Sequence, residues 1–222
     1  HTPFVALHAN EEMESVFNIE ADEEAGAYEM VRYLLDQGHR KIMHLGASPH
    51  LLGGRRRSRA YRRAIEESGI AFDPDLLIET NFSEAMGKAV MQEWLLHHQG
   101  EFLPQAIFCA SDAMALGCMQ TLAEFGVRIP EDLSVCGFDD ALSARTTVPQ
   151  LTTVRQPLRQ MGHQAVESLL ELIEAEPDQE IDLHPVPQVF ETELIIRASV
   201  GPPPDQPVPV PKPPSSWASG NA

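Results

Sequence analysis

The stretch AIFCASDAMALGCMQTLAEFGVRIPEDLSVCGFDD, residues 106–140, contains a strand, a helix and a second strand in direct succession. Residues 106–109 form a continuous apolar run, which is typical of a strand buried on both faces of a sheet. Residues 112–125 carry apolar side chains at helical spacing, and Gly126 supplies a stop signal for that helix. The next apolar run, LSVCGF (133–138), predicts a second strand. A strand–helix–strand unit of this length indicates a right-handed crossover between parallel strands.

The same alternation continues on both sides of this unit. Helical spacing and stop signals predict helices over residues 25–35, 57–68, 84 onward and 158–174. Short segments rich in apolar residues predict strands over residues 4–7, 41–45, 76–79 and 189–196. Strands that alternate with helices of this length predict an α/β fold, in which a parallel sheet carries helices on both faces.

Composition and charge exclude several classes of protein. The chain has 222 residues, of which 43% are hydrophobic and 22% charged, as in ordinary globular proteins. No apolar run approaches the roughly 18 residues of a membrane-spanning helix, and no basic segment of a signal peptide opens the chain, so we expect no membrane partner. Because 33 acidic residues outnumber 16 basic ones, the net charge of −17 repels nucleic-acid phosphates. The chain starts without Met inside a strand pattern, and we therefore treat it as part of a longer protein.

The cysteines and histidines argue against a disulfide framework and against a metal site. Cys109, Cys118 and Cys136 are odd in number, lie in apolar segments and have no CxxC spacing, which predicts buried free thiols in a reducing cytoplasm. None of the nine histidines stands at metal-ligand spacing. Walker-type and GxGxxG phosphate loops are absent from the sequence, so we expect neither a metal nor a cofactor.

Residues 201–222 differ in composition from the rest of the chain. They hold eight of its 18 prolines and almost no core-forming residues, which predicts a disordered or polyproline tail. A proline-rich ligand for an SH3-type partner is an alternative interpretation, but PxxP spacing arises by chance in any such segment.

Polar and aromatic residues follow several of the predicted strands. Ligands of open α/β sheets bind beyond the carboxyl ends of the strands, so these positions are candidates for a site. Together they offer an arginine, an aromatic face, a hydroxyl and a carboxylate, a set that suits a small polyhydroxylated or heterocyclic ligand. The positions are the loop 46–57, Phe82, Ser111 with Asp112, and Asp139 with Asp140.

Each candidate also has a structural interpretation that spacing alone favours. The arginines between residues 55 and 59 fit a solvated start of a helix, and Phe82 fits plain core packing. Asp112 fits the N-cap of the following helix, with Ser111 as the loop residue before it.

Signatures of catalysis are largely missing. The sequence has no GxSxG nucleophile elbow. The sequence alone leaves a Ser111–histidine–Asp139 triad open, but no histidine occupies a diagnostic position. Asp139 and Asp140 are adjacent in a predicted turn, and their side chains should point in different directions, which disfavours a dyad that shares a proton. We therefore expect the protein not to be an enzyme.

Three segments closely resemble the effector-binding domain of the LacI/GalR family of bacterial transcription regulators. They are DEEAGAYEMVRYLLDQGHRKIMHLG (22–46), SDAMALGCMQTLAEFGVRIPEDLSVCGFDD (111–140) and PQLTTVRQP (149–157), in that order and spacing. The resemblance covers residues 3 to about 200 and implies a two-lobed fold like that of periplasmic binding proteins, with an effector held between the lobes. The family's helix-turn-helix, hinge helix and first half of the N-terminal lobe have no counterpart here, so one lobe should be incomplete.

The resemblance also implies a division of the chain and a mode of assembly. Residues 1–20 would be a remnant of the N-terminal lobe and 21–153 the C-terminal lobe. Residues 154–200 would return to the N-terminal lobe and make a final crossing, before the tail of residues 201–222. Members of the family pair through both lobes, so we expect the intact protein to be a homodimer. Apolar residues that flank the Asp139 turn are candidates for the contact, namely Leu142, Val148 and Leu151.

Site residues carry over from the family position by position. Arg57 matches an arginine that grips ligand oxygens, and Phe82 matches an aromatic residue that stacks on or walls the ligand. Asp139 matches a carboxylate that accepts hydrogen bonds from the ligand, and Gln156 matches a crossover residue that lines the cleft. Ser111 stands where the family commonly has Asn, so at this effector contact one hydroxyl replaces a side-chain amide that has both an acceptor oxygen and a donor NH₂ group.

The sequence departs from the family pattern at two further places, of which the second bears on the expected ligand. Glu23 stands where Asn is frequent, which should alter a crossover and not the floor of the pocket. The loop Leu51-Leu52-Gly53 is apolar where some purine-responsive members carry polar contacts, which favours a sugar or related polyol as effector.

The resemblance therefore implies an effector-sensing module of a cytoplasmic transcription regulator that contacts operator DNA only through its helix-turn-helix. A solute-binding receptor of a sugar transport system is the alternative, because the two classes share a fold. A signal peptide upstream would indicate the receptor, and a helix-turn-helix upstream would indicate the regulator.

The charge of the chain gives a first prediction. The net charge of this sequence is −17, and it contains no counterpart of the family's basic helix-turn-helix. The chain alone should therefore not bind operator DNA at physiological salt. Gel-shift titration tests this expectation. Sequence-specific retention that weakens steeply with added salt would contradict it.

Overall fold

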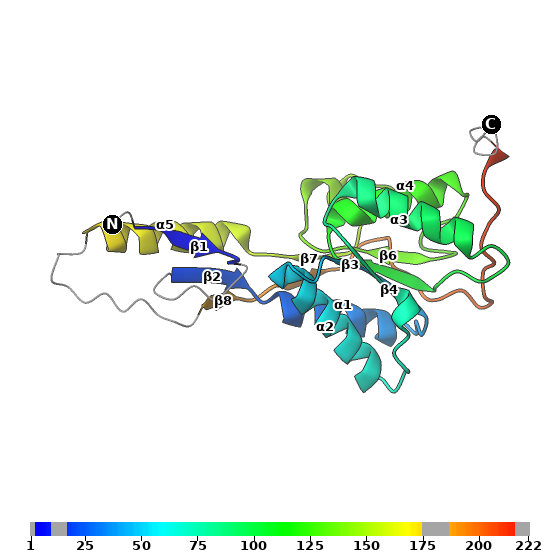
Figure 1. Ribbon diagram of the computed structural model, residues 1–222, viewed down its shortest axis with the longest axis horizontal. Helices are drawn as coiled ribbons and strands as arrows, with labels where there is room; N and C mark the ends of the chain where they lie inside the picture. Colours follow the sequence, from blue (N-terminus) through cyan, green and yellow to red (C-terminus); the bar gives the residue numbers. More distant parts are fainter. Residues whose placement is uncertain (1–2, 10–16, 175–186, 216–222) are drawn as a thin grey trace.

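The computed structural model describes residues 3–9, 17–174 and 187–215, which form a larger and a smaller unit (Figure 1). The larger unit is built on a parallel sheet in the order β4-β3-β5-β6, which confirms the predicted α/β class. Its strands are β3 Ile42–Ala47, β4 Leu77–Thr80, β5 Ala106–Cys109 and β6 Ser134–Cys136. Its helices are α1 Glu23–Asp36 and α2 Leu52–Glu67 on one face, with α3 Glu84–His97 and α4 Asp112–Glu124 on the other (Figure 1).

Short polar side chains cap the first turn of α1, α3 and α4, but not of α2. The Asp22 carboxylate accepts a hydrogen bond from the backbone N–H of Ala25 at 2.9 Å and thereby caps α1. Helix α4 is capped by Ser111, whose hydroxyl accepts from the Met114 N–H at 3.2 Å. The prediction that Asp112 is the N-cap is therefore wrong by one residue: Asp112 is the first residue inside the helix, and its carboxylate is free for other partners.

Close contact between α3 and α4 depends on two glycines. A Cβ atom at Gly117 would meet the carbonyl oxygen of Glu84, and one at Gly87 would meet that of Met114, both far inside van der Waals distance. The backbones of the two helices therefore approach each other directly, and a side chain at either position would push them apart.

The smaller unit is a three-stranded parallel sheet in the order β1-β2-β8, packed against one helix (Figure 1). Its elements are β1 Val5–Leu7, β2 Phe17–Ala21, β8 Gln188–Phe190 and α5 Leu158–Glu174. Its buried core is small and consists of Ile19, Ala21 and Met161. Many large apolar side chains of this unit stay exposed, including Phe4, Leu7, Leu158, Val166, Leu170 and Ile173.

The single strand predicted over residues 189–196 is wrong. Residues 188–190 form β8 in the smaller unit, whereas β9, Glu193–Ile195, pairs antiparallel with β7, Thr153–Arg155, beside the larger sheet. Polar residues 191–193 separate the two apolar parts of this segment, and the chain passes from one unit to the other at residues 191–192. Other passages lie at Asp22 and at residues 156–157, so three segments join the units within the described part of the chain.

The prediction of a disordered tail is wrong for residues 201–215. The N–H of Val210 donates to the carbonyl of Glu101 at 2.9 Å, and the N–H of Leu103 donates to that of Val208 at 2.8 Å. The Val210 side chain is 6% exposed and belongs to the core beneath α3 and α4. Prolines keep the segment extended, and the two valines between them supply the apolar anchors that composition alone did not reveal. Residues 216–222 lie outside the described residues.

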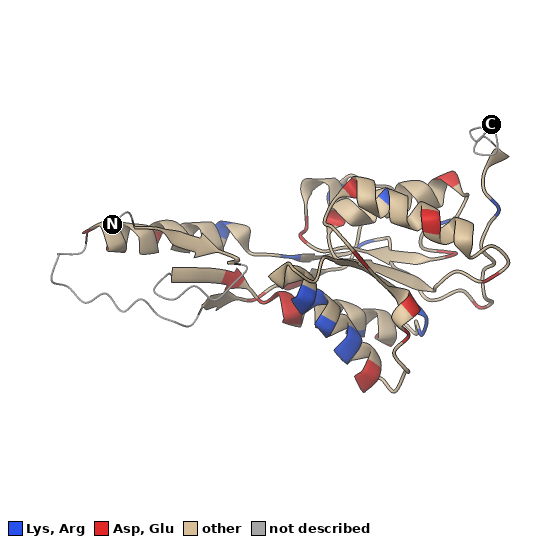
Figure 2. Cartoon of the chain, in the orientation of Figure 1, with Lys and Arg blue, Asp and Glu red and all other residues tan. Residues whose placement is uncertain are grey.

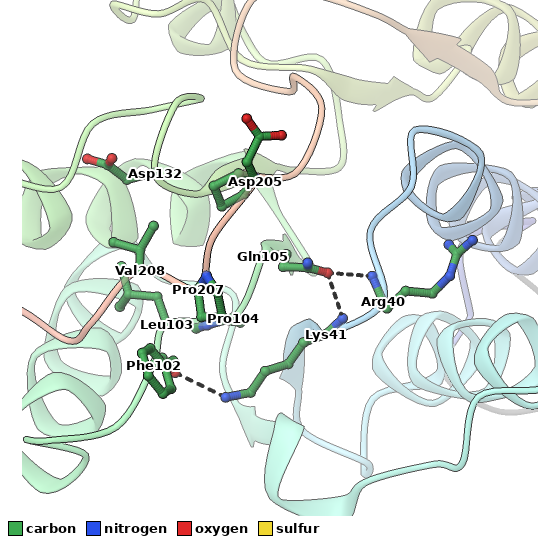
Figure 3. A pocket seen from close by; sticks show the side chains of 11 residues that line it. Arg40, Lys41, Phe102, Leu103, Pro104, Gln105, Asp132, Asp205, Pro207 and Val208 are labelled. Carbon is green, nitrogen blue, oxygen red and sulfur yellow. Dashed lines mark hydrogen bonds between the residues drawn. The ribbon is translucent and has the colours of Figure 1, made fainter.

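A cavity of about 460 Å³ lies between this proline-rich segment and the amino ends of β3 and β5 (Figure 3). The Gln105 side chain accepts hydrogen bonds from the N–H groups of Arg40 and Lys41, and the Lys41 amine donates to the Phe102 carbonyl. These bonds tie the start of β3 to the segment before β5.

Other expectations from the sequence can be compared with the described residues. Cys109, Cys118 and Cys136 are buried free thiols, as predicted. Leu142 and Val148 are exposed at 78% and 96%, but Leu151 is fully buried in the core and cannot be part of a subunit contact. No helix among residues 3–9, 17–174 and 187–215 is long and apolar enough to cross a membrane.

The packed proline-rich segment leads to a prediction about stability. Val210→Ala should lower the free energy of unfolding by about 1–3 kcal/mol, because it leaves a void in a buried site. Val166→Ala on the exposed side of α5 is the matched control and should change it by less than about 0.5 kcal/mol. Urea unfolding measures both. Equal, negligible effects would show that the segment does not stabilise the larger unit.

Candidate functional site

A cavity of about 200 Å³ opens where the smaller unit meets the carboxyl ends of β3 and β4. It is smaller than the roughly 300–1,000 Å³ typical of sites for drug-sized ligands, which suits a small ligand. Among the described residues, the smaller unit contributes His8, which follows β1. The larger unit contributes the remaining lining residues, which are Glu23, Leu51, Leu52, Gly53, Arg56, Arg57 and Phe82.

The guanidinium of Arg57 lies at the centre of the site. Arg57 is only 4% exposed, so the alternative of a solvated helix start is wrong for this residue. Its guanidinium packs over the ring of Phe138, 3.8 Å from the centroid, and lies 5.1 Å from the centroid of Phe82. It donates to the carbonyl oxygen of Ala110 and, at 2.5 Å, to Oε1 of Glu23. The other arginines of α2 are exposed except Arg56, which is half-buried and lines the cavity; Figure 2 shows the basic residues along this helix.

Asp139 and Gln156 form the second part of the site. The Gln156 amide donates to Oδ1 of Asp139 at 2.7 Å, and Arg57 lies 3.7 Å from the same oxygen. Burial raises the pKa of Asp139, while the charge of Arg57 and the hydrogen bond from Gln156 act in the opposite direction. Oε1 of Gln156 is buried and has no hydrogen-bond partner within the described part of the chain. Asp139 also has a φ of 122°, an unusual conformation for a residue with a side chain.

Asp140 points away from this site, as its position in a turn predicted. Its buried carboxylate accepts hydrogen bonds from Arg145 at 2.8 Å, from Arg155 at 2.7 Å and from Arg197. Burial alone would raise the pKa of Asp140, but the three arginines outweigh it and lower the pKa to about 2. The two adjacent carboxylates therefore have separate surroundings and do not share a proton.

Ser111 serves the scaffold of the site. Its hydroxyl donates to the carbonyl oxygen of Phe82 at 3.2 Å and, as described above, caps α4. It thereby fixes the backbone at Phe82, whose ring packs against Arg57. Of the five predicted site residues, Arg57, Phe82, Asp139 and Gln156 lie in one connected cluster, and Ser111 supports that cluster from behind.

The expectation for Glu23 is wrong. Glu23 is 5% exposed, lines the cavity and pairs with Arg57, so it is part of the pocket wall. Glu23 stands where Asn is frequent in the family, and this difference marked the position as unusual. Sequence spacing could not show which arginine its carboxylate would contact. His8 gave no sequence signal at all, and both of its ring nitrogens are buried without a partner in the described chain.

Asp112 connects the site to a segment that joins the units. Its carboxylate accepts from the Thr153 hydroxyl at 2.5 Å, on β7, and from the N–H of Ala141 at 2.7 Å, just after the Asp139–Asp140 turn. Burial raises the pKa of Asp112 to about 7, although both hydrogen bonds act in the opposite direction. A Cβ atom at Gly137 would lie 2.4 Å from this carboxylate, so the close contact requires glycine there.

Comparison with known proteins gives a consistent result. The model of the periplasmic binding protein-like domain family matches residues 31–200. The HTH-type transcriptional repressor PurR of Vibrio atlanticus is 36% identical over 200 residues, which are 89% of this chain and 57% of that protein. The chain thus spans about half the length of the curated relatives it matches.

Two solved structures show the same fold. A sugar-binding transcriptional regulator of the LacI family from Escherichia coli, complexed with phosphate, has a TM-score of 0.77 and 28% identity over 91% of this chain and 70% of its own. A LacI family regulator from Enterococcus faecium with bound ribose has a TM-score of 0.78 and 26% identity over 90% of this chain and 71% of its own.

The buried Asp112 leads to a prediction about pH. Its folded-state pKa of about 7 exceeds the unfolded value of about 3.9, so the folded state holds a proton that the unfolded state releases. The free energy of unfolding should therefore fall as pH rises from about 4 to 7, by about 1.4 kcal/mol for each unit of pKa difference. Asp112→Asn should remove most of this decline, because the amide does not titrate: its oxygen can accept from the Ala141 N–H while its NH₂ group donates to the Thr153 hydroxyl oxygen.

Urea unfolding of the two proteins at pH 5 and pH 8 measures the effect. Asp140 does not interfere, because its pKa of about 2 places its own contribution at lower pH. An identical pH dependence in the wild type and in Asp112→Asn would contradict the assignment.

Proposed function

Because the chain belongs to the periplasmic-binding-protein-like family and, within it, to the LacI/GalR group of transcription regulators, we propose that it is an effector-sensing domain. In this proposal, a small molecule binds in the cavity between the two units and controls DNA binding by a helix-turn-helix elsewhere in the protein. The observation that carries it is the cluster of Arg57, Phe82, Asp139 and Gln156, which joins a cavity to residues 156–157, where the chain passes between the units.

Regulation would follow from differential affinity for two arrangements of the units. An effector that contacts His8 on one unit and Arg57 on the other binds best when the units are at one particular separation. It therefore stabilises that arrangement, and the free energy gained is available to the DNA-binding part. The protein would act in the cytoplasm without catalysis, cofactor or metal.

Several observations favour a sugar as the effector. Carboxylate and amide oxygens at Asp139 and Gln156 accept hydrogen bonds from hydroxyl groups, and the ring of Phe82 offers an apolar face to the C–H groups of a sugar ring. The walls at Leu51 and Leu52 add apolar surface. The neighbour from Enterococcus faecium holds ribose. A solute-binding receptor for sugar transport is the second candidate, since it would use the same fold and cavity.

The site residues lead to a prediction about affinity. Asp139→Asn should weaken effector binding by roughly 2–4 kcal/mol, because a charged acceptor becomes an amide that accepts at one atom only. The variant should fold, because Asn has the size and shape of the Asp that already adopts the positive φ at this position. Arg57→Ala should weaken binding at least as much. Calorimetric titration with D-ribose, D-glucose and the purine base adenine measures the affinities.

Asp140→Asn is the matched control, because Asp140 is adjacent in sequence but bonded to three arginines outside the cavity. It should leave affinity nearly unchanged while it lowers stability. Unchanged affinity in both Asp139→Asn and Arg57→Ala would remove these residues from the site. Tight binding of adenine and of neither sugar would overturn the sugar proposal.

We also propose that the intact protein is a homodimer, for which the exposed Leu142 and Val148 are candidate contacts. Analytical ultracentrifugation of the full-length protein at micromolar concentration should give the mass of two chains. Leu142→Glu combined with Val148→Glu should shift it toward one chain. A monomeric full-length wild type would refute this expectation.

A further inference from the structure

The charges around the cavity are unusual for a site built on arginine. Three carboxylates, Glu20, Glu23 and Asp139, surround the guanidinium groups of Arg56 and Arg57. Glu20 pairs with Arg56 at 2.6 Å, and Glu23 pairs with Arg57 at 2.5 Å. The cluster therefore carries one more negative charge than positive, and each arginine already has a carboxylate partner.

Glu23 holds the central place in this arrangement. Its Oε1 accepts from Arg57, and its Oε2 lies 3.9 Å from Arg56, so one buried carboxylate faces both guanidinium groups. A Cβ atom at Gly53 would lie 2.9 and 3.0 Å from the two carboxylate oxygens. The bare backbone of Gly53 thus makes room for the carboxylate between α1 and α2.

The unpartnered polar groups in and beside the cavity are suited to an uncharged ligand. In the lining, the two ring nitrogens of His8 offer one donor and one acceptor in the neutral ring, and Nε of Arg57 is a donor without a partner in the described residues. Beside the cavity, Oε1 of Gln156 is an unpartnered acceptor. Asp139 can accept a further hydrogen bond. An anionic ligand would have to displace Glu23 from Arg57 or lie beside it, and either choice leaves a buried negative charge without compensation.

We propose that Glu23 determines the charge of the effector: by occupying Arg57 it makes the site accept an uncharged, hydroxyl-rich molecule and reject the corresponding phosphate ester or carboxylate. This inference deepens the proposed function and rests on it. Glu23 would thus determine specificity, and Arg57 would donate hydrogen bonds to uncharged oxygen atoms of the effector.

Inorganic phosphate is a probe of this proposal that does not depend on the identity of the effector. Glu23→Gln keeps the shape of the side chain but frees the positive charge of Arg57. The variant should bind phosphate more than about tenfold more tightly than the wild type, because a hydrogen bond to a charged group becomes available to the anion. Calorimetry and thermal unfolding, each with added phosphate, measure the change in the full chain.

Glu24→Gln is the matched control. Glu24 is the next residue in the first turn of α1, but it pairs with Arg59 and Arg63 on the surface, at 3.3 and 3.5 Å. The substitution removes the same formal charge from the same end of the helix and should leave phosphate affinity at the wild-type level. Equal phosphate affinities in Glu23→Gln and Glu24→Gln would overturn the proposal.

A second comparison uses D-ribose and ribose 5-phosphate. The wild type should prefer ribose by at least about tenfold, and Glu23→Gln should reduce that preference by a similar factor. A wild type that binds ribose 5-phosphate as tightly as ribose overturns the inference even if Glu23→Gln does not fold. A wild type that binds no neutral sugar, with phosphate binding gained in Glu23→Gln, supports the role of Glu23 and counts instead against the sugar proposal.

Discussion

The buried guanidinium of Arg57 imposes the constraint on which the rest of the site depends. A positive charge with so little exposure is tolerated only if carboxylates, carbonyls and aromatic faces replace the water it has lost. Glu23 from α1, Ala110 from the end of β5 and Asp139 from the turn after β6 supply the polar partners, and Phe138 supplies the ring face. One side chain on α2 thus draws the ends of three other elements together at the mouth of the cavity.

A second network links that mouth to the segments that join the two units. Asp112 binds both Thr153 on β7 and the backbone at Ala141, while Asp140 gathers Arg155 on β7 with two other arginines. Strand β7 runs directly into residues 156–157 and from there into the smaller unit. Hydrogen bonds and ion pairs therefore link the Asp139–Asp140 turn to this connection. This arrangement suits a domain in which a bound molecule selects between two relative positions of the units.

Expectations from the sequence failed where the outcome depended on distant partners. The segment 189–196 fits a single strand by sequence, yet its two halves pair with different strands, because strand pairing follows from the available sheet edges and not from composition. The proline-rich residues 201–215 contain few core formers, but Val208 and Val210 are enough once α3 and α4 present an apolar surface. Glu23 was assigned to a crossover because nothing in its neighbourhood indicates Arg57, which is 34 residues away.

The alternation of apolar runs and helical periodicities by itself determined the α/β class, the order of helices and strands from α1 to β6, and the ends of those strands at which a site would lie. These properties depend on local periodicity and on the geometry of parallel sheets, which a sequence displays directly. The alternation did not reveal β2 or β7, or the division between β8 and β9. Only the tertiary structure decided which charges meet: Arg57 with Glu23 and Asp139, and Asp140 with its three arginines. Electrostatic partnership depends on distances of a few ångströms and on burial, and both are set by packing between segments that are far apart in the chain.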